Sequence, residues 1–135
     1  MKTPYLFLLA MFIPFMFSCK KNEKEATLET KTALLTRAPW VIFKEELLID
    51  GSWKLEVLTL DGIVLTFRTD GTYKLEKEGQ VGYFSWQFTE NETKIIMTNG
   101  NPPLRAITNL TKDELQMTCP PTIQGEPEER YTFVH

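Results

Sequence analysis

The sequence predicts an all-β fold, a single antiparallel up-and-down meander that closes into a small barrel or half-barrel after a short N-terminal helix. Two observations predict it. From Trp40 onward the chain consists of short runs rich in β-branched and aromatic residues. These runs are separated by turn pairs at Asp50-Gly51, Asp61-Gly62, Asp70-Gly71 and Asn99-Gly100. Glycine, Asp and Asn tolerate the positive φ of a type I′ turn, so each pair is expected to join two neighbouring strands.

Apolar and polar residues alternate along most of these runs, which predicts strands with one buried face and one wet face. Strands are expected at residues 40–49, 53–60, 63–69, 72–77, 81–89, 93–98, 104–110, 114–119 and 129–134. The alternation predicts a core of Ile63, Leu65, Phe67, Tyr73, Leu75, Phe84, Trp86, Phe88, Leu115, Met117, Cys119, Tyr131 and Phe133. The segment "VIFKEELLI" alternates poorly, so the first strand is expected to be bulged or bent.

A short helix is expected before the first strand. In "TLETKTALLTR", Leu28, Leu34 and Leu35 lie at near-helical spacing, and the segment stops before Pro39. The residue before a proline is pushed out of the helical region of backbone space. We therefore predict a helix that ends here and caps one end of the barrel.

Residues 1–18 are predicted to be a secretory signal peptide. Lys2 precedes an apolar run that is shorter than the roughly 20 residues a membrane-spanning helix needs. The segment "MFSC" resembles the bacterial lipobox, which implies cleavage before Cys19 and attachment of lipid to its sulfur. Two or three acyl chains would then make a permanent membrane anchor.

The expected domains are the signal peptide (1–18), the lipidated cysteine and a flexible tether (19–33), and the barrel domain (34–135). The tether alternates Lys and Glu and has too little apolar surface to order itself. The resemblance implies a lipid-anchored protein of the cell envelope. Because Lys20 is not the aspartate of inner-membrane retention, the outer membrane is favoured, with the periplasmic and surface faces left open.

Composition argues against several functions. The net charge of −3 and the absence of a basic patch make nucleic acid an unexpected partner. His135 is the single histidine and the last residue, which argues against a metal site or a Ser-His-Asp triad. Cys119 stands beside two prolines without a neighbouring base, and is expected to be a small buried hydrophobe. We expect no catalytic residue, no metal and no cofactor, and hence no enzyme.

Five stretches of the chain carry a family resemblance: "LLTRAPW", "LTFRTDGTY", "GYFSWQFTENETKIIM", "ITNLTKDELQM" and "RYTFV". Because of these five stretches, residues 34–135 resemble the lipocalin-like domains found in secreted lipoproteins of Bacteroidota. The resemblance implies a small up-and-down barrel or half-barrel, with no established ligand for most members. The opening segment "WVIFKEELLIDGSWKLEV" departs from the family and is expected to hold an extra hairpin, which leaves strand count and barrel closure open.

The aromatic inner face suggests a binding function, because barrels of this type have room for one small ligand. The candidate lining for a small apolar ligand is Phe67, Tyr73, Trp86, Phe88 and Tyr131. The same side chains could instead fill a solid core, since a domain of this size needs most of its apolar groups packed. Both interpretations stay open.

The alternative function is that of an accessory protein of an outer-membrane complex, with a filled core that binds nothing. Its contacts would be a sheet edge or the proline-rich loops "NGNPPLR" and "CPPTIQGEPEER". Loops of such length in a compact fold are either functional or loose. The sequence identifies no particular protein partner.

Overall fold

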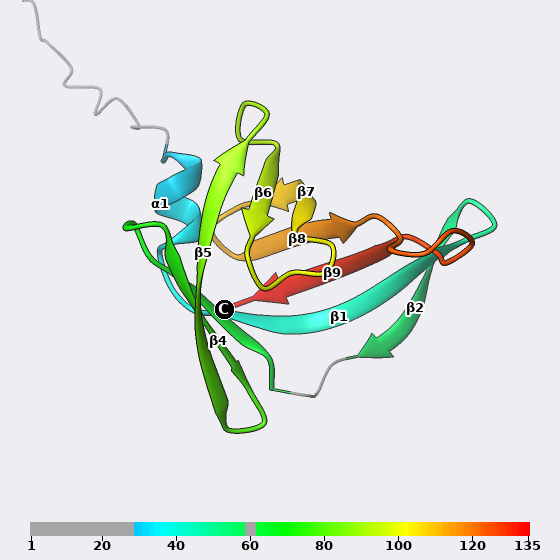
Figure 1. Cartoon of the computed structure of the whole chain (residues 1–135), viewed down its shortest axis with the longest axis horizontal. Coiled ribbons are helices and arrows are strands. Elements are labelled where there is room, and N and C mark those ends of the chain that lie inside the picture. The colour runs from blue at the N-terminus through cyan, green and yellow to red at the C-terminus, as the bar shows by residue number, and fades with distance from the viewer. Residues whose placement is uncertain (1–28, 59–61) are drawn as a thin grey trace, which may run out of the picture.

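The computed structural model describes residues 29–58 and 62–135 and confirms the predicted all-β fold (Figure 1). Its one helix is α1 (Lys31–Leu35). The strands are β1 (Trp40–Ile49), β2 (Ser52–Leu58), β3 (Val64–Phe67), β4 (Thr72–Lys77), β5 (Gln80–Thr89), β6 (Lys94–Met97), β7 (Leu104–Leu110), β8 (Glu114–Cys119) and β9 (Glu129–Val134). The predicted signal peptide, Cys19 and most of the tether lie outside the described residues, as does Asp61.

Eight of the nine described strands form a closed antiparallel barrel, so closure, which the sequence left open, is complete. Each strand from β3 to β8 pairs with the next one along the chain, as in a meander. The circle closes on β1, which pairs with β3 on one edge and with β9 on the other. In Figure 1, β1 and β9 run side by side along the length of the molecule.

The extra hairpin expected in the opening segment is formed by β1 and β2. Strand β2 pairs with residues 44–49 of β1, beyond the two β1 residues that pair with β3. It therefore extends the sheet outside the closed circle. The expected irregularity of β1 is also present, as a register shift against β9 between Ile42 and Lys44, where Phe43 is the extra residue. A second shift, at Glu45 and Glu46, has its extra residue, Glu56, in β2. At each shift two residues oppose one, which bends the strand that holds the extra residue.

The turns follow the sequence prediction in part. Asp50 and Gly51 have φ of 52° and 74°, as the predicted type I′ turn requires. At Asp70-Gly71 only the glycine has positive φ, 84°, and the loop is longer than a two-residue turn. The Asp70 carboxylate there accepts hydrogen bonds from the Thr72 N–H at 2.9 Å and hydroxyl at 2.6 Å.

The prediction of a tight hairpin at Asn99-Gly100 is wrong. Neither residue has positive φ, and a loop of residues 98–103 joins β6 to β7. The loop is held by hydrogen bonds from the Gly100 N–H to the Met97 carbonyl and from the Met97 N–H to the Pro103 carbonyl. Pro102 and Pro103 have no N–H for a ladder, so the strands cannot extend to a tight turn here.

The predicted core is confirmed, and it continues into α1. All the residues expected to face inward are buried or partly buried, with Leu35, Trp40, Ile42, Ile95 and Met97 added. Thr30 caps α1 by accepting a hydrogen bond from the Ala33 N–H at 3.1 Å. The buried indole of Trp40 donates to the Leu35 carbonyl at 2.8 Å, which fixes the helix against the start of β1.

Candidate functional site

The barrel interior holds a cavity of about 200 Å³ that opens to solvent. Its lining is Ile42, Ile63, Leu65, Tyr73, Leu75, Met97, Asn99, Gly100, Arg105, Tyr131 and Phe133. Most of this wall is aliphatic or aromatic, with polar groups at a few positions. A concave apolar site with a few convergent polar groups is the usual form of a small-molecule site.

A second depression of about 270 Å³ lies against the β4–β5 hairpin and shares Leu75 and Asn99 with the cavity. These two residues therefore stand at the border between the interior and the outer surface. Asn99 belongs to the 98–103 loop, the connection that the sequence had predicted to be a tight turn. The loop thus forms part of the cavity wall.

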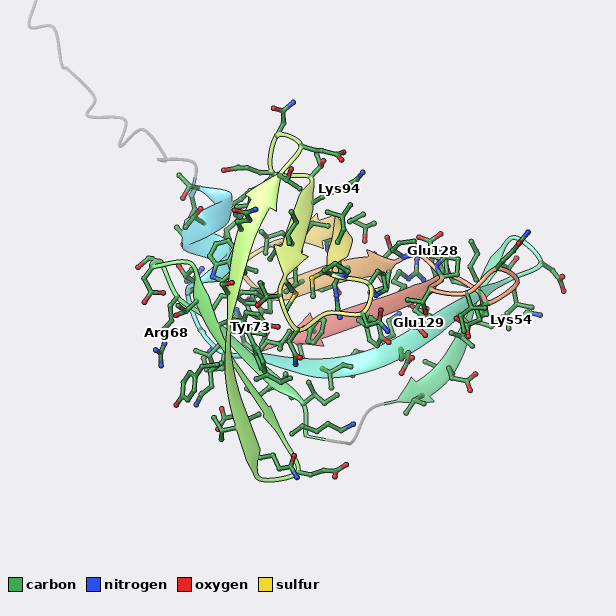
Figure 2. The ribbon with its side chains drawn as sticks, viewed as in Figure 1. Lys54, Arg68, Tyr73, Lys94, Glu128 and Glu129 are labelled. Atoms are coloured by element: carbon green, nitrogen blue, oxygen red, sulfur yellow. The ribbon has the colours of Figure 1, made fainter. Side chains whose placement is uncertain are left out.

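Tyr73 comes from β4 and is almost fully buried, with 2% of its surface exposed. In Figure 2 it lies inside the barrel, whereas Arg68 projects from the surface. Burial raises the pKa of the Tyr73 hydroxyl, while the Asn99 backbone N–H and the positive charge of Arg105 act to lower it. At neutral pH the hydroxyl is protonated and available as a donor.

Tyr131 comes from β9, where period-two geometry places it on the same face as Glu129. Its hydroxyl donates a hydrogen bond of 2.6 Å to the Glu129 carboxylate. Burial raises the pKa of Tyr131, and the hydrogen bond to Glu129 and the negative charge of Glu45 raise it further. Tyr131 therefore stays neutral, and its ring forms part of the cavity wall.

Arg105 is the charged residue of the cavity wall. It lies on β7 opposite Ile95, and its guanidinium carbon is 5.8 Å from the centre of the Tyr131 ring. Its Nε is buried and has no hydrogen-bond partner in the described part of the chain. Arg105 also takes part in none of the ion pairs formed among residues 29–58 and 62–135. Arg105 thus places a positive charge in the cavity wall beside the Tyr131 ring.

Cys119 ends β8 and is buried as a free thiol, as the sequence predicted. Burial raises the pKa of the thiol, the charge of Arg105 lowers it, and the charges of Glu129, Glu128 and Glu45 raise it. Because the thiolate is the reactive form, a buried thiol with a raised pKa is a poor nucleophile. This geometry favours a packing role for Cys119.

The five predicted ligand-contact residues fall into two groups. Tyr73 and Tyr131 line the cavity. Phe67, Trp86 and Phe88 instead form an aromatic cluster, in which the Trp86 ring meets Phe67 edge-on at 5.7 Å and Phe88 edge-on at 5.2 Å. Within that cluster the Trp86 indole donates to the carbonyls of Arg68 and Thr72 at 3.1 and 3.0 Å. These contacts are those of a packed core.

Arg105 and Asn99 are the polar side chains of the cavity wall that the sequence reasoning missed. In "LRAIT", period-two alternation puts Arg105 on the same face as Ile107, which is partly buried against the core. A charged residue in register with inward-facing apolar residues was the available signal. Asn99 carried no comparable signal, because its position depends on the shape of the 98–103 loop.

No group of three or more His, Cys, Asp or Glu side chains in residues 29–58 and 62–135 is arranged to hold a metal ion. The one helix of that part of the chain is too short to cross a membrane. No protein-family model matches the chain, and no curated protein matches it significantly.

Proposed function

We propose that this protein is a lipid-anchored binding protein of the cell envelope, and not an enzyme, whose barrel holds one small apolar molecule. The observation that supports binding is the cavity of about 200 Å³, walled by apolar side chains and open to solvent. A water molecule occupies about 30 Å³ in the liquid, so the cavity has room for roughly seven waters or a short-chain molecule of similar size. A solid core would leave no such space.

Leu75 offers a direct test, because it stands at the border of the cavity and is only partly buried. Leu75→Trp replaces the branched leucine side chain with a larger indole ring at this border, without overpacking a closed core. We expect isothermal titration calorimetry to show one octan-1-ol bound per wild-type chain, and a loss of affinity of tenfold or more in the variant. Leu55→Trp is the matched control, because Leu55 is 52% exposed on β2 outside the barrel. Absence of binding to the wild type would contradict the proposal.

Native mass spectrometry of protein purified from its own host addresses the natural ligand. A copurifying molecule of constant mass, lost in Leu75→Trp, is the expected result. Repeated purification of ligand-free chain would count against the binding function.

The lipid anchor rests on the lipobox-like "MFSC" segment, and its test is membrane fractionation. With Cys19→Ala, the protein is expected to leave the membrane fraction, because the acyl chains that hold it there are attached to that sulfur. A variant that remains bound as tightly as the wild type would contradict anchoring through Cys19.

A second candidate function, protein interaction, is favoured by strand β2. In the described residues β2 pairs only with β1, so its other edge carries unpaired backbone groups. Leu55 and Val57 on this strand are 52% and 40% exposed. Exposed sheet edges bind extended segments of partner proteins by strand addition.

Crosslinking in the native membrane tests this second candidate. A photoreactive side chain at Leu55 is expected to give a reproducible protein adduct, and the same group at Lys112, in the exposed β7–β8 turn, is expected to give none. Equal labelling at both positions, or none at either, would argue against an interaction through β2.

A further inference from the structure

Arg105 brings a positive charge to a cavity whose other walls are mostly apolar. A charged group taken out of water is costly unless it is paired or hydrogen-bonded. Arg130, a second partly buried arginine, is paired, since its Nε donates to the Glu46 carboxylate at 2.8 Å. Arg105 has the aromatic face of Tyr131 at 5.8 Å but no partner for its buried Nε among the described residues.

One carboxylate of the interior, that of Glu129, does not take the place of that partner. Glu129 lies on β9, where it accepts the Tyr131 hydroxyl at 2.6 Å, and it forms no ion pair with Arg105 in the described part of the chain. The cavity therefore combines an apolar wall, a guanidinium with an unmet donor and the protonated hydroxyl of Tyr73. An anionic oxygen is the natural complement to such a set of donors.

Building on the proposed binding function, we propose that the ligand is a small apolar carboxylate, whose chain lies on the apolar wall and whose carboxylate pairs with Arg105. A guanidinium recognises a carboxylate through parallel N–H donors, which gives both charge and geometry. The size of the cavity, about 200 Å³, fits one short chain and excludes a two-chain lipid.

The test compares octanoate with octan-1-ol, which share a chain length and differ in charge. Isothermal titration calorimetry on the wild-type full-length chain is expected to show octanoate bound at least tenfold more tightly than octan-1-ol. Arg105→Met keeps the length of the side chain and removes its charge. We expect it to weaken octanoate binding tenfold or more and to change octan-1-ol binding less than twofold, because only octanoate uses the guanidinium.

Two further variants make the result specific. Arg68→Met removes an exposed arginine at the barrel surface and is expected to leave both affinities unchanged. Arg105→Lys keeps the positive charge and is expected to retain a preference for octanoate, which covers the case in which Arg105→Met fails to fold.

The outcomes separate the two proposals. If the wild type binds octan-1-ol as tightly as octanoate, or if Arg105→Met keeps the preference for octanoate, the carboxylate assignment is overturned while the binding function stands. If the wild type binds neither molecule, the binding function fails and the assignment fails with it.

Discussion

Arg130 joins three strands through two kinds of contact on the outside of the barrel. Its Nε donates to the Glu46 carboxylate of β1 at 2.8 Å, and its guanidinium lies 4.3 Å from the centre of the Trp53 ring of β2. Glu46 also pairs with Lys44 at 3.3 Å. Because β9, β1 and β2 all contribute, these residues hold β2 to the closed barrel.

The charge of Glu46 is predicted to stabilise the fold in a pH-dependent way. The hydrogen bond from Arg130 is the largest of the contacts that lower the pKa of Glu46, against the opposing effect of burial. A carboxyl whose pKa is lower in the folded state stabilises fully above its unfolded pKa, about 4.3 for Glu. This stabilisation is lost as the pH falls through the folded pKa.

Glu46→Gln is therefore expected to lower the free energy of unfolding by about 1.5 kcal/mol at pH 7, the size of one charged hydrogen bond. The difference from wild type should shrink at pH 3. Urea unfolding at pH 7 and pH 3 measures the difference in the free energy of unfolding between variant and wild type. Glu56→Gln, on the exposed part of β2, is the control, and its free energy of unfolding is expected to differ from that of the wild type by no more than about 0.5 kcal/mol. A difference that does not depend on pH would exclude a role for the Glu46 charge.

The number of reactive thiols tests the burial of Cys119 and the lipidation of Cys19. Cys119 is 3% exposed, and burial raises its pKa, so it is expected not to react with a thiol reagent in the native protein. In urea one thiol per chain is expected, since the sulfur of Cys19 would be in its lipid thioether. Two thiols in urea would contradict lipidation, and fast native labelling that Cys119→Ala abolishes would contradict the burial of Cys119.

Strand β1 shows how one element both closes the barrel and carries an addition to it. Its first residues pair with β3, its later residues pair with β2, and its other edge pairs with β9. The two register shifts accompany this change of partner. The β2 strand is consequently outside the closed circle, and its loss should leave the circle intact.

Trp53→Ala tests how β2 is held. We expect the variant to lower the free energy of unfolding by about 1 to 2 kcal/mol, because it removes the cation–π contact with Arg130 as well as buried ring area. Leu55→Ala on the same strand, 52% exposed, should change it by less than about 0.5 kcal/mol. Equal effects in urea unfolding would show that the Trp53 ring contributes no specific contact.

Local sequence pattern determined the strands and the core better than it determined the site. Strands β4, β8 and β9 begin and end where the alternation and turn residues predicted. The prolines of "NGNPPLR" indicated a loop between β6 and β7, whereas the turn preference of Asn99-Gly100 was misleading, because the two following prolines override it. The alternation indicated that Arg105 faces inward, but its place in the cavity wall depends on β1, β3, β4, β6 and β9, which barrel closure brings together.

At the scale of the whole molecule, the closing contacts of the barrel are unequal. Strand β1 joins β9 through six residue pairs but joins β3 through only Trp40↔Leu65 and Val41↔Val64. One further hydrogen bond of 3.0 Å runs from the Ile42 N–H to the Ile63 carbonyl. Among residues 29–58 and 62–135, the β1–β3 seam is thus the part of the circle with the fewest paired residues.

Hydrogen–deuterium exchange should detect local opening at the β1–β3 seam. Because local opening requires fewer broken contacts there, amides that bond across β1–β3 are expected to exchange at least about tenfold faster than those between β8 and β9, which share six residue pairs. Ile42, Ile63 and Leu65 of the seam also line the cavity, so octanoate should slow exchange at the seam more than at β8–β9. Equal protection of the two regions in the free protein would mean that side-chain packing, and not the number of backbone pairs, sets the stability of closure.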